Sequence, residues 1–232
     1  MQIAEGRITE IISGFNDKFA LRIDCSLEMI PAPGEYLLAY EIGDAAAIAD
    51  SVLAVPLFQV WDSSSAALQP SYPIPSSWKP GSTLILRGPL GHGFKIPGDI
   101  RHLALATLGQ DISRLLPLLN QFPNTDIALF SNAMLPDLPL VVEAHPLSAL
   151  PDSLIWADIL VMDLPMKDLP KLRQILSLEH QESIPCLAQA LILTPMPCGS
   201  IAECGVCAVP ARKGYKLACK DGPVFDLNKL KW

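Results

Sequence analysis

The sequence predicts a small antiparallel β-barrel, then a parallel α/β domain, then a short cysteine-rich segment. Up to residue 97, short stretches of alternating apolar and polar residues are separated by turn residues, a pattern typical of antiparallel sheets. Beyond residue 97, buried-type strands alternate with helical patterns, which favours a parallel sheet. We therefore expect a barrel over 1–97, an α/β domain over 98–193 and the cysteine-rich segment over 194–232.

Strands of the barrel are indicated by alternation of apolar and polar side chains, because alternate residues of a strand face opposite sides of a sheet. The turn PAPGE and a Pro/Ser-rich connection over 62–81 separate some of these stretches. We expect strands, in chain order, at 2–12, 19–25, 35–41, 52–61 and 82–88.

In the α/β part, apolar runs of strand length are separated by two helical patterns, at 111–121 and 167–181. The second pattern places Leu169, Leu172 and Leu176 on one face. Because the chain has 22 prolines, many short elements are favoured over long helices. We expect strands at 102–107, 126–131, 141–145, 158–164 and 186–193.

Composition excludes several classes of protein. Half of the 232 residues are hydrophobic, which is enough for a sizeable core. The net charge of −7 argues against a nucleic-acid partner. The first 15 residues lack a signal-peptide pattern, and no apolar run reaches the ~20 residues of a membrane helix. We therefore expect a cytoplasmic protein without membrane insertion, where disulfides explain clustered cysteines poorly.

Four of the six cysteines, Cys198, Cys204, Cys207 and Cys219, fall within 22 residues. Their spacing is C-x5-C-x2-C-x11-C. Structural zinc sites usually use two C-x2-C-like pairs, and only one such pair is present here. Plant-type [2Fe–2S] centres use C-x4-C-x2-C and a distant fourth cysteine, so this sequence differs by one extra residue in the first gap. The spacing favours an iron–sulfur cluster, and zinc stays as the alternative.

Other features of the cysteine-rich segment agree with a cluster. Gly199 and Gly205 let the backbone approach inorganic sulfur and direct N–H groups at it. The segment from residue 198 to 232 has six basic and three acidic side chains, a net charge of +3, whereas the rest of the chain carries −10. This basic charge offsets an anionic cluster or docks an acidic partner, and we expect the lysines to rim the cluster. Cys25 and Cys186 stand singly in apolar stretches and are interpreted as core residues.

The stretch CGSIAECGVCAVPARKGYKLACKDGPVFDLNKLKW closely resembles the end of the electron-transfer subunit of two-subunit dihydroorotate dehydrogenases. Upstream, RGPLGHGF (87–94) is similar to the family's GPLGNGF, and PAPGEYLLA (31–39) is similar to its PGQF strand. The resemblance spans the chain and is most specific in the cysteine-rich segment. It implies a ferredoxin-reductase-like barrel and a Rossmann-like α/β domain.

In function, the resemblance implies an electron relay connected with pyrimidine biosynthesis. Family members hold FAD between barrel and α/β domain, receive electrons from NADH, and pass them through a [2Fe–2S] cluster to a flavin in a catalytic partner subunit. Carried over to this sequence, the cluster ligands are Cys198, Cys204, Cys207 and Cys219. We accordingly expect a redox subunit of an oxidoreductase complex, a hetero-oligomer with a catalytic flavoprotein.

The cofactor motifs of the family carry over only in part. The flavin motif Arg-Pro-x-Ser corresponds to LAVPLFQVW, where Pro56 is kept and Val55 replaces the arginine. Gly88, Gly91 and Gly93 of RGPLGHGF are the remaining candidates for flavin contact, although a turn between domains also explains these glycines. FAD therefore stays open.

The nucleotide motifs depart further. The turn TLGQDIS (107–113) has a single glycine, and Asp111 in it would repel a phosphate. MDLPMKD (162–168) has neither the cysteine nor the glycine of the family's Cys-Gly-Pro motif. We expect no NAD(P)H binding in the classical mode. Because of these departures, a zinc-stabilised, non-redox assembly protein on a degenerate reductase scaffold stays as the alternative function.

Overall fold

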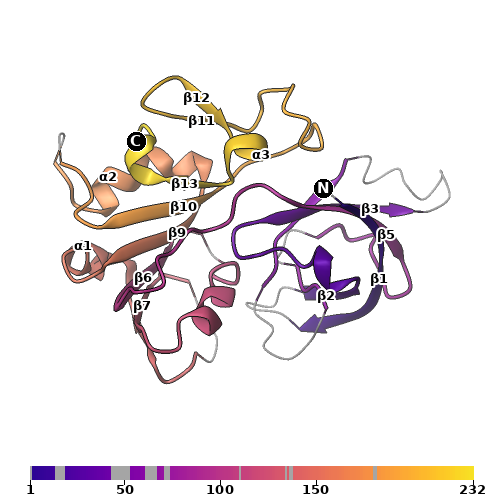
Figure 1. Ribbon diagram of the computed structural model, residues 1–232, viewed down its shortest axis with the longest axis horizontal. Helices are drawn as coiled ribbons and strands as arrows, with labels where there is room; N and C mark the ends of the chain where they lie inside the picture. The colour runs from indigo at the N-terminus through magenta and orange to yellow at the C-terminus, as the bar shows by residue number, and fades with distance from the viewer. Residues whose placement is uncertain are drawn as a thin grey trace.

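A computed structural model describes residues 2–13, 19–42, 53–60, 67–70, 74–109, 111–133, 135, 138–179 and 182–232. Parts of the predicted 52–61 strand, of the 62–81 connection and of the 167–181 helix lie outside these described residues. The described chain forms two large sheets side by side, with a C-terminal hairpin lying over the second one (Figure 1). Within the described part of the chain, no helix is long and apolar enough to cross a membrane.

The first sheet is a curled, antiparallel sheet of five strands in the order β2-β1-β5-β3-β4 (Figure 1). Residues 67–70 connect its two edges, since Leu68 bridges to Ile23 and Pro70 bridges to Gln59. Buried side chains such as Ile8, Leu37 and Leu86 fill its interior. The strands are β1 (Gln2–Ser13), β2 (Phe19–Asp24), β3 (Tyr36–Ile42), β4 (Val55–Leu57) and β5 (Thr83–Leu90).

The second sheet has six strands in the order β13-β10-β9-β6-β7-β8. The first five strands along the chain are parallel, and β13 pairs antiparallel with β10 at one edge. The chain adds β7 and β8 on one side of β6 and then adds β9 and β10 on its other side. This change of side creates a switch point of the kind found in doubly wound folds. The strands are β6 (His102–Thr107), β7 (Asp126–Phe130), β8 (Val142–His145), β9 (Ile159–Pro165), β10 (Leu187–Leu193) and β13 (Val224–Asp226).

Both faces of the second sheet are buried, as expected for parallel strands. Along β6, Leu103 and Leu105 enter one core, whereas Ala104 and Ala106 enter the other. Two short helices, α1 (Leu150–Ser153) and α2 (Leu172–Ile175), contribute to the second of these cores. Leu169, Leu172 and Leu176 are all buried there, so the predicted apolar face is confirmed.

The two predicted helices are much shorter than expected. Instead of a helix over 111–121, the chain forms turns and then a 3-10 helix over Leu116–Gln121, with Pro117 in its first turn. Instead of a helix over 167–181, a 3-10 helix over Met166–Lys171 containing Pro170 precedes α2. Prolines lack the N–H that an α-helix interior needs, so they shorten both segments. The proline content therefore predicted helix length better than the apolar periodicity did.

The cysteine-rich segment packs into the scaffold. Its hairpin consists of β11 (Ala208–Pro210) and β12 (Tyr215–Leu217), followed by α3 (Ala218–Asp221). From α3 the chain enters β13, which completes the second sheet, and then a 3-10 helix over Leu227–Lys229. The last strand of the α/β sheet is thus contributed by the segment that carries the cysteines.

Candidate metal centre

The structure brings the four clustered cysteines together as two pairs. The Sγ atoms of Cys207 and Cys219 lie 3.3 Å apart. A disulfide would need about 2.05 Å. Two thiolates on one tetrahedral metal, at metal–sulfur distances of ~2.3 Å, lie roughly 3.8 Å apart. The separation of this pair is therefore closer to that of two ligands of one metal than to that of a disulfide.

Cys198 and Cys204 form the second pair. The Cys204 side chain and the backbone N–H groups of Ala202, Glu203 and Cys204 lie near enough to the sulfur of Cys198 to lower its pKa. The N–H of Ala202 also reaches the sulfur of Cys219. One peptide group thus contacts a sulfur of each pair, which places the two pairs next to each other.

The loop between Cys198 and Cys204 has an unusual backbone. Ser200 (φ 64°) and Ala202 (φ 63°) are both left-handed, although neither is glycine. The left-handed conformation costs a non-glycine residue about 1–2 kcal/mol of conformational free energy. Residues held in this conformation cluster at functional sites. Successive turns of this kind direct several N–H groups into one concavity, as in known anion and iron–sulfur sites. The extra residue in the first cysteine gap is accommodated by this backbone, which keeps Cys198 beside Cys204.

The two pairs differ in their protonation chemistry. Partial desolvation raises the pKa of Cys198, but the hydrogen bonds from Cys204 and from the loop N–H groups outweigh it and lower the pKa to about 6. Burial and the neighbouring sulfur of Cys207 raise the pKa of Cys219 to about 12. A bound metal cation would favour the thiolate form of both. The loop therefore favours the thiolate form of Cys198, whereas burial favours the neutral thiol of Cys219.

One side of the site is buried in the protein and the other side faces solvent. Cys207 and Cys219 are buried, Cys198 is half-buried and Cys204 is exposed. Next to Cys204, the apolar side chains of Ile201 and Val206 are 59% and 48% exposed. The outer side of the site is thus an apolar, solvent-facing edge.

Side chains of the first sheet hold the inner side of the site. The Tyr36 hydroxyl lies 2.7 Å from Oγ of Ser200, and it donates to the backbone oxygen of Cys219 at 3.4 Å. The Arg87 guanidinium donates to the backbone oxygen of Gly199. Burial, together with the nearby cysteine sulfurs, raises the pKa of Tyr36 to about 12, so Tyr36 stays a neutral hydrogen-bond donor.

The remaining two cysteines lie apart from this site. Cys25 packs partly against the core of the first sheet, and Cys186 packs partly against one core of the second sheet. Desolvation raises the pKa of both thiols. They have the surroundings expected of small core residues.

Three of the sequence motifs meet at the junction of the two sheets. In the RGPLGHGF motif, a Cβ on Gly91 (φ +81°) would lie 2.6 Å from Pro223 and 2.8 Å from the oxygen of Gly222. His92 donates its N–H to that same oxygen at 2.7 Å. In the PAPGE turn, a Cβ on Gly34 would lie 2.6 Å from Val224. The junction therefore needs glycine for close packing against the DGPVF strand.

The candidate flavin residues also have neighbours within the chain. Pro56 pairs with Leu38 in the first sheet. A Cβ on Gly88 would lie 2.5 Å from Leu37, and one on Gly93 would lie 2.7 Å from the oxygen of Pro33. Packing within the chain accounts for Gly88, Gly91 and Gly93, which agrees with the turn explanation.

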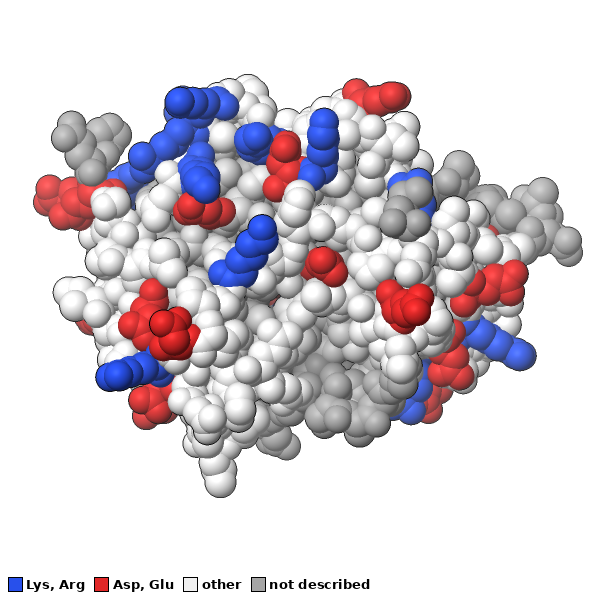
Figure 2. Space-filling view, in the orientation of Figure 1, with Lys and Arg blue, Asp and Glu red and all other residues white. Residues whose placement is uncertain are grey.

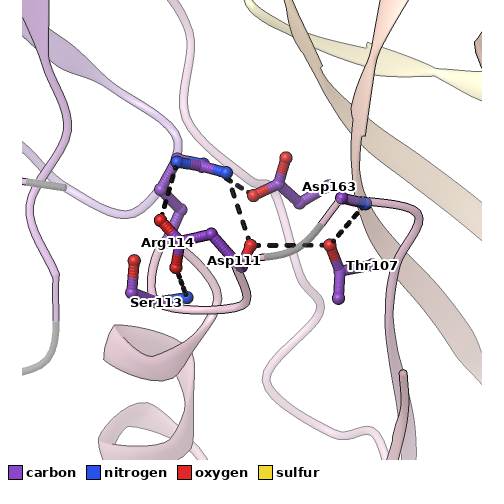
Figure 3. A network of polar contacts seen from close by, with 6 residues as sticks. Thr107, Asp111, Ser113, Arg114 and Asp163 are labelled. Atoms are coloured by element: carbon purple, nitrogen blue, oxygen red, sulfur yellow. Dashed lines mark hydrogen bonds and ion pairs between the residues drawn. The ribbon is translucent and has the colours of Figure 1, made fainter. Parts of the chain in front are cut away.

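At the switch point, an internal ion pair occupies the ends of β6 and β9, where Thr107 pairs with Asp163 (Figure 3). Nε of Arg114 lies 2.6 Å from Oδ2 of Asp163, and Nη1 lies 3.4 Å from Oδ2 of Asp111. The side chains of Asp163 and Arg114 are 0% and 6% exposed. Burial raises the pKa of Asp163 to about 6, although Arg114 opposes the shift.

This ion pair is a feature that sequence reasoning missed. Asp111 was recognised only as a residue that would repel a phosphate, and its partner Arg114 follows three positions later. The described residues between β6 and the 3-10 helix at Leu116–Gln121 form turns, whereas dinucleotide folds begin a long α-helix there and bind pyrophosphate at its N-terminus. The carboxylates of Asp111 and Asp163 lie instead at the switch point, where dinucleotide folds bind their ligands.

Among the described residues, no three His, Cys, Asp or Glu side chains converge where they could hold one metal ion. A closed structural zinc site needs four ligands around a single point. A [2Fe–2S] cluster instead takes two thiolates on each of two irons. The arrangement of the cysteines in two pairs matches the two thiolates that each iron of such a cluster needs.

Comparison with known proteins gives a match in the same segment. Residues 194–231 match the family model described as the iron–sulfur cluster binding domain of dihydroorotate dehydrogenase B. This match includes all four clustered cysteines and supports a bound iron–sulfur cluster. None of the curated proteins matches the sequence.

Solved structures show the fold of the whole chain. The NADH-dependent reduced ferredoxin-NADP oxidoreductase, studied for flavin-based electron bifurcation, is 17% identical with a TM-score of 0.72, over 98% of this chain and 90% of that one. The ferredoxin reductase in carbazole 1,9a-dioxygenase is 16% identical with a TM-score of 0.55, over 77% and 67%. A ferredoxin NADP+ reductase from Neisseria gonorrhoeae with bound FAD and NADP is 12% identical with a TM-score of 0.55, over 83% and 99%.

The resemblance inferred from the cysteine-rich segment is thereby confirmed: residues 194–231 are similar to the iron–sulfur cluster binding domain of dihydroorotate dehydrogenase B, and the chain has a ferredoxin-reductase-like fold.

Proposed function

We propose that the chain is the electron-transfer subunit of an oxidoreductase complex and exchanges electrons with a flavin-containing partner through a [2Fe–2S] cluster. The observation that carries the proposal is the arrangement of the cysteines as two adjacent pairs, Cys198 with Cys204 and Cys207 with Cys219. Each pair would ligate one iron. When bound, the cluster supplies one-electron redox chemistry.

The residues around the site would perform three tasks. Backbone N–H groups of Ala202 and Glu203 would donate to ligand sulfur, and such donors tune the reduction potential. Tyr36 and Arg87 would fix the loop against the first sheet. Burial of Cys207 and Cys219 would keep solvent from one side of the cluster.

The exposed edge would be the side where the partner approaches. Ile201, Cys204 and Val206 are exposed together there. Exposed apolar side chains at a functional edge are typical of protein contact surfaces. Docking at this edge would exclude water from the cluster and bring the partner's flavin to its most accessible side.

The chain would consist of three domains or segments: the barrel, the α/β domain and the cysteine-rich segment. Their boundaries would fall near residues 97 and 194. The ferredoxin NADP+ reductase from Neisseria gonorrhoeae, which has a similar fold, has bound FAD, so we include FAD as a cofactor to be tested. The ion pair of Arg114 and Asp163 fills the switch point, so electrons would reach the chain by a route other than NADH bound in the classical mode.

One preparation tests the proposal against the zinc-stabilised alternative. The full chain is purified without oxygen, its iron, zinc, sulfide and flavin are measured, and visible and electron paramagnetic resonance spectra are recorded before and after reduction with dithionite. About two irons and two sulfides per chain, with an S = 1/2 signal on reduction, support the proposal. A colourless protein with one zinc per chain overturns it.

A further inference from the structure

A groove with basic walls lies beside the hairpin of the cysteine-rich segment. Its volume is about 740 Å³, within the range of ligand-binding clefts. The hairpin turn, β13 and the RGPLGHGF turn surround it. It is lined by His92, Ala211, Arg212, Lys213, Lys216, Asp221, Val224, Phe225, Asp226, Asn228, Lys229 and Leu230.

Four of the six basic side chains of the cysteine-rich segment line this groove, and none of the four clustered cysteines does. We expected the lysines to rim the cluster; Arg212, Lys213, Lys216 and Lys229 instead surround the groove. In Figure 2 most of the blue side chains gather over the upper part of the molecule, where Figure 1 places β11, β12 and β13. The basic charge is therefore concentrated on a surface of its own.

The charges in the groove are not balanced. Lys216 pairs with Asp221 at 3.7 Å, and Lys229 pairs with Asp226 at 3.4 Å. Arg212 and Lys213 have no ion pair with any described residue, and both are exposed. The two carboxylates of the groove are thus already paired, and two cations remain to attract an anionic group.

The floor of the groove is apolar and offers an edge of the second sheet. Val224, Phe225 and Leu230 are 8%, 7% and 3% exposed. Val224 and Phe225 belong to β13, the edge strand of that sheet. An extended peptide lying in the groove would direct alternate side chains at this apolar floor.

The groove is continuous with a second hollow. The second hollow, of about 450 Å³, adjoins it and shares six of its lining residues, among them His92 and Phe225. This second hollow adds Lys95 and the half-exposed Leu187. Together the two hollows form one channel with basic walls along β13, which suits a chain better than a compact anion.

We propose that this channel binds an extended acidic segment of the flavoprotein partner, with its carboxylates on Arg212 and Lys213 and its apolar side chains above Val224 and Phe225. This inference rests on the proposed function in one respect only: the proposed function identifies the flavoprotein partner as the protein that supplies the acidic segment. The charge distribution gives specificity, because the rest of the chain carries −10 and would repel the same segment elsewhere. Contact at the channel would tether the partner while the cluster edge at Cys204 stays accessible.

The test uses a fluorescein-labelled peptide of about twelve residues in which glutamate alternates with leucine, matching the period of an extended strand. Its binding to the full chain is followed by fluorescence anisotropy. The variant Arg212→Glu/Lys213→Glu should bind the peptide at least about tenfold more weakly, and wild-type binding should weaken as salt rises from about 50 to 300 mM. Lys231→Glu is the matched control, since Lys231 is an exposed lysine of the same segment outside the groove lining.

The control should stay within about twofold of the wild type, and a peptide with lysine in place of glutamate should not bind. Equal binding by the charge-reversed variant, or displacement of the peptide by ATP with tighter binding of ATP itself, overturns the proposal. Visible spectra of the variants show whether each protein is folded with its cluster. Because peptide binding requires no redox activity, a zinc-containing protein that binds the peptide would contradict the proposed function and leave the channel assignment standing.

Discussion

The hydroxyl oxygen of Tyr36 lies 2.7 Å from Oγ of Ser200, although 164 residues separate them in the chain. The same hydroxyl also donates to the backbone oxygen of Cys219. One buried side chain of the first sheet thus contacts both segments that supply cysteines, so the two-sheet scaffold determines the geometry of the site.

Replacing Tyr36 with phenylalanine should loosen the site from the scaffold. The variant loses a buried hydroxyl with two partners, so we expect the free energy of unfolding to fall by about 1 kcal/mol. Loss of visible absorbance in the presence of a chelator should also become faster than in the wild type. Tyr40→Phe is the control, because Tyr40 lies on the same strand and is 46% exposed. Identical bleaching rates for the two variants would contradict this role of Tyr36.

Strands were predicted well because their signal is local. Alternation over β1, β3 and β5 reflects which face of a sheet each residue joins, and that pattern is readable from neighbours in the chain. Helices were predicted poorly, since the apolar spacing around Leu169 and Leu172 exists equally in a 3-10 helix and a short α-helix. The structure uses the same apolar face on a shorter backbone.

In the candidate site, the spacing of the cysteines identified the segment but not its geometry. The left-handed backbone at Ser200 and Ala202 could not be predicted, because neither residue favours it. The pair of Arg114 and Asp163 joins residues 49 positions apart, and no local pattern indicates such a contact. Sequence reasoning therefore predicted a departure from the nucleotide motif without indicating the ion pair of Arg114 and Asp163.

Replacing Cys198 with serine tests the member of the ligand set with the irregular spacing. Because its sulfur lies beside Cys204 and accepts three backbone N–H groups, we expect the variant to lose most of its cluster, with iron content reduced about tenfold. Cys186→Ser, which changes a cysteine outside the cluster, should keep its iron. Iron and sulfide are measured after anaerobic purification, and unchanged occupancy would remove Cys198 from the ligand set.

Substitutions at Ala202 test the strained loop. Its φ of 63° is a conformation that glycine adopts freely and that a β-branched residue adopts at high cost. We expect Ala202→Gly to stabilise the folded protein by about 0.5–1 kcal/mol and Ala202→Val to destabilise it by more than about 1 kcal/mol. Urea unfolding followed by tryptophan fluorescence gives both values. Equal stability of the glycine and valine variants would show that the loop does not hold this conformation.

The buried carboxyl of Asp163 should leave a measurable pH dependence. Burial raises its pKa to about 6, above the ~3.9 of an aspartate in an unfolded chain. The native state therefore holds this proton more tightly than the unfolded state does. Its stabilising contribution is present at low pH and is lost as the pH rises through about 6.

Asparagine at position 163 keeps the shape of the side chain and removes the titration. As the pH rises from 5 to 7, the unfolding free energy of the wild type should therefore fall by about 1 kcal/mol relative to that of Asp163→Asn. Asp99→Asn, a change at an exposed aspartate, corrects for the general effect of removing one negative charge. A difference that stays constant between pH 5 and pH 7 would mean instead that Arg114 outweighs burial and holds Asp163 ionised throughout this range.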